Sequence, residues 1–151
     1  MTRVVGCRVA VFLGVRAQRQ AVLAQAAPEW FWVILDEAVI RRTIGTAEVM
    51  RGQWRRLVDA ARLPSVRIQV LPLRAIANPA PPTNFTIVEF ADESERDVVY
   101  IELLTGGIHL EGGDSRGYAA VFDSVVDAAL GPAESIELIG DIESGFGGEG
   151  R

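Results

Sequence analysis

Two neighbouring carboxylates and two neighbouring guanidinium groups stand close together in the segment 36–42. Asp36 and Glu37 end an unbroken apolar run, and Arg41 and Arg42 follow within about one helical turn. A buried carboxylate without a partner is costly, so these acids must either reach the surface or pair here. If the segment is helical, Glu37 precedes Arg41 by four residues, which is the favourable order for an ion pair. The pattern indicates either a polar cluster that binds a ligand or partner, or a structural ion-pair network at a strand end.

Aromatic side chains suggest a second candidate site. Tyr100 and Glu102 alternate along one expected strand and therefore share a face. With the indoles they could build an apolar pocket that has a few polar groups, closed by the proline-rich segment 74–84 as a lid. The alternative is that the indoles belong to the core. The three tryptophans are Trp30, Trp32 and Trp54.

Metal-binding and covalent chemistry find little support in the sequence. His109 and Glu111 are two apart on an expected strand and could offer two ligands, but His109 is the only histidine and a site needs a third ligand. A surface pair is the favoured interpretation. Cys7 is the only cysteine, which excludes an intrachain disulfide and fits a reducing compartment. With no nucleophile elbow, phosphate loop or dinucleotide fingerprint in the sequence, we expect no catalytic residue, cofactor or metal.

Charge and hydropathy limit the classes of partner. The net charge is −5 although all 15 basic residues are arginines, so the chain repels phosphate backbones and is not expected to bind nucleic acid by itself. No segment approaches the roughly 18 apolar residues of a membrane span. Arg16 and Arg19 interrupt the early apolar stretch, which argues against a secretory leader. We therefore expect a cytoplasmic protein.

Hydrophobic periodicity predicts four helices. The clearest runs from about 46 to 63, with Gly45 as its N-cap and a core stripe that includes Met50 and Trp54. The other three are expected at 8–25, 116–130 and 133–142.

Strands are predicted between these helices. The apolar run Trp30 to Leu35 is typical of a strand buried on both faces. Four more strands are expected at 66–70, 85–90, 98–103 and 108–111, with Gly106-Gly107 as a primed turn before the last. Because these four follow one another, we expect them to be antiparallel. The fold class is therefore α+β, a mostly antiparallel sheet of about five strands packed with about four helices. Residues 1–143 form one domain, and 144–151 a flexible glycine-rich tail.

An ordered series of short motifs resembles a known family. The motifs are Asp36-Glu37-Ala38 with Arg41-Arg42, Val49-Met50, Ile68-Gln69-Val70-Leu71-Pro72, Val99-Tyr100-Ile101-Glu102, Tyr118 to Phe122, Ala129-Leu130 and Ser135. In order and spacing they resemble the C-terminal domain of actinobacterial XRE-type helix-turn-helix regulators. That domain is one of unknown function, and its proteins are described as Scr-type toxin–antitoxin-like transcriptional regulators. The resemblance covers about Arg16 to Ile142.

The resemblance implies a regulatory effector domain, and one departure limits it. Only about 30 residues precede the expected strand at Trp30, which is too few for the helix-turn-helix of the family, so DNA binding does not carry over. Our first hypothesis is a non-enzymatic regulatory domain that senses a ligand or binds a small partner protein. The alternative is a small cyclase-like enzyme that acts on a natural-product substrate in the apolar pocket. A remnant without activity and a homodimer are also open. The expected ligand- or partner-binding residues are Asp36, Glu37, Arg41, Arg42, Tyr100 and Glu102.

Overall fold

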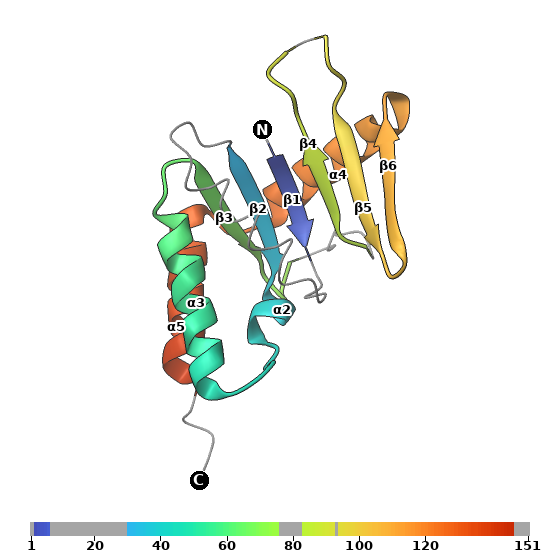
Figure 1. Cartoon of the computed structure of the whole chain (residues 1–151). Coiled ribbons are helices and arrows are strands. Elements are labelled where there is room, and N and C mark those ends of the chain that lie inside the picture. The colour runs from blue at the N-terminus through green and yellow to red at the C-terminus, as the bar shows by residue number, and fades with distance from the viewer. Residues whose placement is uncertain (1, 7–29, 76–82, 93, 147–151) are drawn as a thin grey trace.

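A computed structural model describes residues 2–6, 30–75, 83–92 and 94–146. The helix expected at 8–25 and most of the proline-rich segment lie outside these residues. Among the described residues the chain forms four helices and six strands (Figure 1). Their bounds are β1 Thr2–Gly6, β2 Phe31–Asp36, α2 Glu37–Arg41, α3 Ala47–Ala61, β3 Val66–Leu71, β4 Phe85–Val88, β5 Val98–Leu103, β6 Gly106–Glu111, α4 Gly113–Ala128 and α5 Pro132–Gly145.

The strands form one mixed sheet in the order β3-β2-β1-β4-β5-β6. A parallel pair, β2 and β3, and an antiparallel group, β4, β5 and β6, lie on either side of β1 (Figure 1). The strand β1 pairs parallel with β2 and antiparallel with β4. The α+β class is confirmed.

The expectation of a mostly antiparallel, five-stranded sheet needs correction at β3. This strand does not pair with β4 but runs parallel to β2. The reason is the helix α3, because a helical crossover returns the chain in the same direction, whereas a short turn reverses it. The strand β4 pairs with β1 on the side away from β2. The unpredicted strand β1 raises the number of strands to six.

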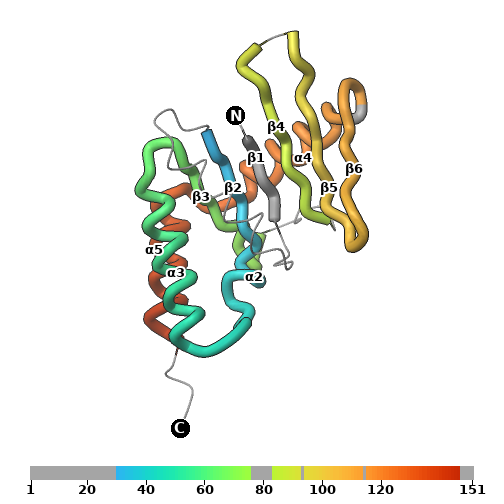
Figure 2. Tube along the Cα trace, in the orientation of Figure 1, coloured from blue at the N-terminus to red at the C-terminus, as the bar shows by residue number. Residues whose placement is uncertain are grey.

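Helices cover the sheet from both faces. On one face α4 contributes Phe122 and Val125 to a core with Ile34 of β2 and Leu71 of β3. On the opposite face α3 and α5 pack together and cover Val70 of β3. Figure 2 traces α3 and α5 alongside β3, while α4 crosses behind the strands. The alternation of side chains along β2 and β3 thus feeds two separate cores.

The apolar run around β2 is a central strand, as predicted, but it begins one residue later. Trp30 precedes the strand and is 56% exposed, whereas Ile34 is 1% exposed. The remaining residues of β2 are half-buried. Full burial in β2 is therefore limited to Ile34 on the α4 face, and the side chains on the other face are half-buried.

The helix α3 confirms the predicted core stripe, because Met50 and Trp54 are both buried. Its N-cap is Thr46 rather than Gly45: the Thr46 hydroxyl accepts a hydrogen bond from the Val49 N–H at 3.3 Å. Glycine has no side chain that could accept this bond, which explains the shift by one residue.

Four further boundaries differ from expectation. The turn between β5 and β6 consists of Leu104 and Thr105, so Gly106 and Gly107 lie within β6. The helices α4 and α5 begin earlier than expected, and α5 continues through the first two residues of the expected tail. The ring of Phe146 then packs against Trp54 with centroids 4.9 Å apart, which ties this end to the core. None of the described helices has the length and apolar character that crossing a membrane requires.

Candidate functional site

The charged segment begins where β2 gives way to the short helix α2. Asp36 is the N-cap, and its Oδ1 accepts a hydrogen bond from the Ala38 N–H at 2.8 Å. A carboxylate in this position satisfies a helix donor that otherwise has no partner. The side chain of Asp36 is therefore used by its own backbone turn.

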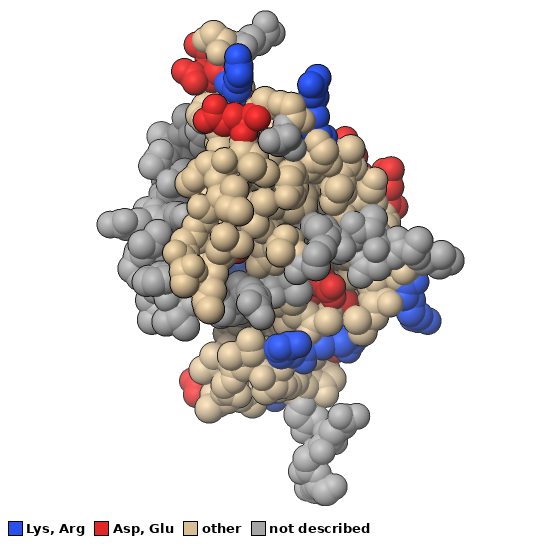
Figure 3. All heavy atoms as spheres, turned by 90° about the vertical axis from the view of Figure 1, so that its right-hand side faces the viewer, with Lys and Arg blue, Asp and Glu red and all other residues tan. Residues whose placement is uncertain are grey.

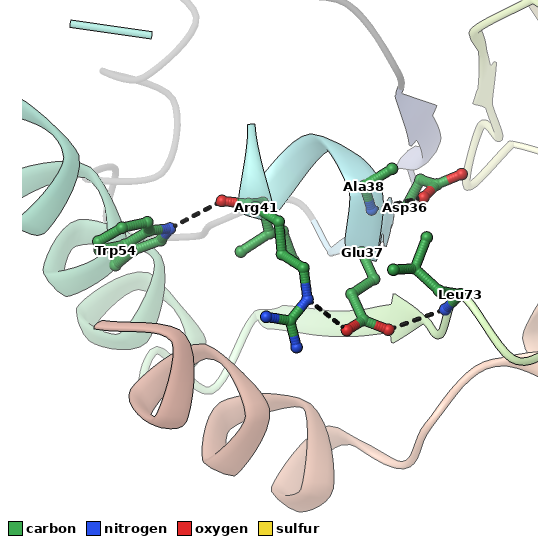
Figure 4. Close-up of polar contacts among 7 residues, drawn as sticks. Asp36, Glu37, Ala38, Arg41, Trp54 and Leu73 are labelled. Atoms are coloured by element: carbon green, nitrogen blue, oxygen red, sulfur yellow. Dashed lines mark hydrogen bonds and ion pairs between the residues drawn. The ribbon is translucent and has the colours of Figure 1, made fainter. Parts of the chain in front are cut away.

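Glu37 is the first helical residue, and its carboxylate is buried, with 7% of the residue exposed. Both oxygens have partners (Figure 4): Oε1 accepts from Arg41 Nε at 2.6 Å, and Oε2 accepts from the Leu73 N–H at 2.8 Å. Leu73 lies just after β3, so one side chain joins the ends of two neighbouring parallel strands. The pair with Arg41 is the i to i+4 ion pair that the sequence predicted.

The environment of Glu37 favours its ionised form. Burial is the largest single effect and raises the pKa, but the hydrogen bonds from Leu73 and Arg41 and the charges of Arg41 and Arg74 together hold the pKa below its usual value. A carboxylate that stays ionised at neutral pH is not suited to donate a proton as a general acid. The geometry of Glu37 is that of a structural anion.

The two arginines of this segment differ in their surroundings. Both residues are exposed, but Arg41 Nε donates to Glu37 Oε1, whereas Arg42 contributes its backbone N–H, which closes the helix on Ala38 O at 3.1 Å. The Trp54 indole donates to the Ile40 carbonyl at 3.1 Å and so fastens α2 to α3 (Figure 4). The segment is thus a junction between β2, β3 and α3. Arg42 remains available at its surface.

Tyr100 and Glu102 lie on β5, on the sheet face opposite α4. The Tyr100 ring is half-buried and tilted against the His109 ring, with centroids 5.0 Å apart. Glu102 is exposed and lies opposite Gly107 of β6. Among the described residues, no three potential metal ligands lie close enough together to hold a metal ion, and this includes the surroundings of His109.

The two sets of predicted site residues do not meet. The strand β5 is separated from β2 by β1 and β4 in the sheet. Three strand spacings amount to about 14 Å. The alternation of side chains also places Asp36 on the same face as Ile34, whereas Tyr100 and Glu102 point to the other face. The fold therefore does not bring the two sets together in a single pocket.

The tryptophans are likewise dispersed. Trp32 packs edge-on against Phe122 of α4, and its indole donates to Gln69 Oε1 at 2.6 Å. Trp54 is 1% exposed and lies in the core on the opposite face, with α5. Trp30 is exposed. The predicted core role is confirmed for Trp54, and the three indoles do not line a shared cavity.

The turn between β5 and β6 carries an exposed apolar group that the sequence analysis did not single out. Leu103 is 45%, Leu104 97% and Ile108 43% exposed. We call these three residues the hairpin tip. Figure 3 looks onto the side of the molecule that carries β6 and shows broad uncharged surface there. The available signal was the Leu103-Leu104 pair directly before Thr105-Gly106-Gly107, because leucines next to turn residues have little core to enter.

A family model described as a domain of unknown function (DUF5753) matches residues 8–141. The chain belongs to this family. No curated protein and no solved structure matches it.

The DUF5753 match defines which parts of the structure the family shares. It includes the elements from β2 to α4 and most of α5, and therefore the α2 junction, the face with Tyr100 and the hairpin tip. The strand β1 precedes the matched range, although it lies between β2 and β4 in the sheet.

Proposed function

We propose that this DUF5753 chain is a non-enzymatic regulatory domain that acts by binding a partner protein through the hairpin tip. The domain is proposed to be related to the C-terminal half of XRE-family regulators, as its ordered motifs suggest. Its net charge of −5 opposes contact with a phosphate backbone, so the regulated target would be a protein. The alternation of strand side chains places Leu103 and Ile108 on the α4 face of the hairpin and Tyr100 and Glu102 on its other face.

The observation that carries this proposal is the exposure of the hairpin tip. Leu104 is 97% exposed, which leaves almost its whole side chain in water. Burying a leucine side chain stabilises a complex by about 1.5–3 kcal/mol relative to leaving it exposed. Two further apolar residues on the same hairpin enlarge the group, and contiguous exposed apolar surface is typical of protein interaction sites.

The shape of the hairpin supports a protein partner rather than a small ligand. Small-molecule sites are concave and enclose most of the ligand. The hairpin tip instead projects at the end of two strands beside the edge of the sheet (Figure 1). A projecting apolar side chain is suited to enter a pocket of a partner, as an interface anchor does.

Charged residues of the strand would orient the partner. Glu102 precedes Leu103 and is exposed, so it lies at the border of the apolar group. Exposed charges around an interface contribute more to association rate and specificity than to affinity. Arg42 offers an opposite charge, but at the α2 junction several strands away. We therefore place Glu102, and not Arg42, at the border of the proposed interface.

The test compares two variants in a co-purification assay. The tagged chain is co-expressed with whatever small protein the adjacent genes encode, and Leu104→Glu is measured beside Val49→Glu. Val49 is a matched control, since it is 57% exposed but lies on α3, away from the hairpin. We expect Leu104→Glu to abolish recovery of the partner, Val49→Glu to retain it, and both to melt like the unaltered chain.

Two results would count against the proposal. If the unaltered chain recovers no partner, or if Leu104→Glu recovers as much as Val49→Glu, the hairpin tip is not the binding site. Fluorescence anisotropy with mixed DNA duplexes at low salt supplies an independent check. Salt-sensitive binding in the micromolar range would show that the target is nucleic acid instead.

A further inference from the structure

The two edges of the sheet are treated differently by the fold. At the β3 edge, Val70 exchanges both of its backbone groups with the α4–α5 connection: its carbonyl accepts from the Leu130 N–H at 2.9 Å, and its N–H donates to Ser135 Oγ at 2.9 Å. The Gln69 side chain donates to the Leu130 carbonyl at 2.8 Å. This cover blocks the pairing of another strand, which is how proteins protect sheet edges.

The opposite edge is the strand β6. It stands last in the strand order, and all its residues are exposed except Leu110, which is half-buried. Within the described part of the chain, β6 packs against β5 and α4. Figure 3 faces this side of the molecule. An exposed edge strand presents a row of backbone donors and acceptors that can pair with another strand.

The register of the hairpin determines which backbone groups face outward. Leu103 and Gly106 close a two-residue turn, and the register continues without a bulge to Glu111. Residues that close such a turn pair through hydrogen bonds, and the pattern alternates along the strand. The backbone groups of Gly107, His109 and Glu111 therefore point away from β5. These three residues are the positions at which an added strand would pair.

The side chains at two of these positions, His109 and Glu111, are complementary to each other. The imidazole of His109 can donate a hydrogen bond that a carboxylate such as that of Glu111 accepts, and both residues are exposed. In an antiparallel pair of two β6 strands centred on Leu110, His109 lies opposite the partner's Glu111, and the reverse pair forms by symmetry. Hydrogen-bonded and oppositely charged pairs of directly opposed residues stabilise a strand pair, and like charges oppose it. A register centred on His109 would instead place two histidines opposite each other.

We propose that the chain forms a symmetric homodimer in which β6 pairs antiparallel with β6 of a second copy, in the register centred on Leu110. Two His109–Glu111 pairs flank the symmetry axis, and the sheet continues from one subunit into the other. Self-complementary contacts of this kind are characteristic of twofold dimers. The occupant of the free edge is thus a second copy of this chain.

Apolar contacts on the α4 side of the sheet fit the same register. Leu110 would meet the partner's Leu110 at the axis, on the face that each α4 covers. Directly opposed side chains in such a pair lie about 4.5–5.5 Å apart, within contact distance for leucine.

The dimer interface is separate from the proposed partner site. Leu104 lies six residues from Leu110 along the hairpin, or about 20 Å along an extended strand. The hairpin tips would therefore stand at opposite ends of the paired strands and remain exposed. This inference does not rest on the partner-binding function, and Leu104→Glu is expected to leave the dimer unchanged.

The experiment exchanges charges across the interface. Sedimentation velocity measures the dimer in the unaltered chain, in His109→Glu and in Glu111→Arg. The first variant opposes two acids and the second opposes two basic groups, so each should weaken the dimer by at least about tenfold. In an equimolar mixture the acid introduced in one variant meets the base introduced in the other, and the retained Glu111 meets the retained His109. Native mass spectrometry should then detect the mixed dimer by its mass.

Defined outcomes would overturn the proposal. An unaltered chain that remains monomeric at about 0.1 mM, where a micromolar dimer is well populated, excludes it. A dimer that both variants leave intact must use another surface. A mixture in which the two weakened variants stay monomeric excludes this register. Thermal melting of each variant checks that the changes at these exposed positions leave the subunit folded.

Discussion

The ring of Tyr100 lies directly over the backbone of Gly107 on the neighbouring strand. A methyl group placed on the Gly107 Cα would overlap the Tyr100 ring and its hydroxyl. The two residues are diagonal neighbours, because Tyr100 is opposite His109 and Glu102 is opposite Gly107. Glycine here serves close approach within a strand rather than the turn that the sequence pattern indicated.

Gly107→Ala should therefore destabilise the hairpin. The ring of Tyr100 must move away from the new methyl group, and overpacking of this kind costs about 1–3 kcal/mol. Gly117→Ala is the matched control: it lies in α4 with no atom within 4 Å of the added carbon, and alanine favours a helix by roughly 0.5–1 kcal/mol over glycine. In urea unfolding, the free energy of unfolding should thus fall for Gly107→Ala and rise for Gly117→Ala. Equal midpoints would contradict the packing of Tyr100 on Gly107.

The buried carboxylate of Glu37 should make stability depend on pH. Its pKa in the fold lies below the usual value of 4.5, so its ionised form stabilises the native state above about that pH. As the pH falls through the lowered pKa, this contribution is lost. Glu37→Gln removes the charge that Arg41 and the Leu73 N–H recognise, and should cost about 1–3 kcal/mol at pH 7.

Urea titrations of the Glu37→Gln variant and the unaltered chain at pH 7 and at pH 3 measure this effect. The difference between the two proteins should shrink as the pH falls below 4.5, because protonation then removes the same charge from the unaltered chain. A difference that is independent of pH would show that the ionised carboxylate contributes nothing.

Trp54 should dominate the core that α3 and α5 build. It is 1% exposed, its ring packs on Phe146, and its indole donates to the Ile40 carbonyl. Trp54→Ala should cost about 3–5 kcal/mol. Trp30→Ala provides the control, since Trp30 is 56% exposed and surface substitutions usually change stability by less than about 0.5 kcal/mol. A loss below about 1 kcal/mol for Trp54→Ala in chemical denaturation would contradict its assignment to the core.

Local patterns predicted the elements whose partners are near in sequence. The stripe with Met50 and Trp54 fixed the buried face of α3 because one helix determines it alone. The spacing of Glu37 and Arg41 likewise predicted an ion pair that the structure contains. Strand order could not be predicted in this way, because it depends on pairing between segments that are distant in the sequence. Nothing near Val66 indicates that β3 pairs with β2 and not with the next strand.

The candidate site was less predictable for the same reason. That Leu73 donates to Glu37 follows from the parallel alignment of β2 and β3, which no local pattern reveals. Knowing this bond changes the interpretation of Glu37 from an available acid to a structural one. The position of the β5–β6 turn was not predicted either. The sequence does not show that the Tyr100 ring packs over the backbone of Gly107 on the neighbouring strand.

The adjacent arginines Arg41 and Arg42 provide a final comparison within one turn of chain. Arg41→Gln leaves the buried Glu37 carboxylate without its ion-pair partner, and loss of a partner to a buried group costs about 1–3 kcal/mol. The Arg42 side chain is exposed, and within the described residues no ion pair involves it. Arg42→Gln should therefore change stability by less than about 0.5 kcal/mol.

Thermal melting and urea unfolding of Arg41→Gln and Arg42→Gln, side by side, measure this difference. Both variants lose one positive charge, so any effect of net charge is common to them and cancels in the comparison. The co-purification assay adds a functional readout: neither position lies at the hairpin tip, so both variants should retain the partner once folded. If Arg42→Gln melts normally but loses the partner, the α2 junction belongs to the interface, and the binding surface must extend across the sheet from β5 to β2.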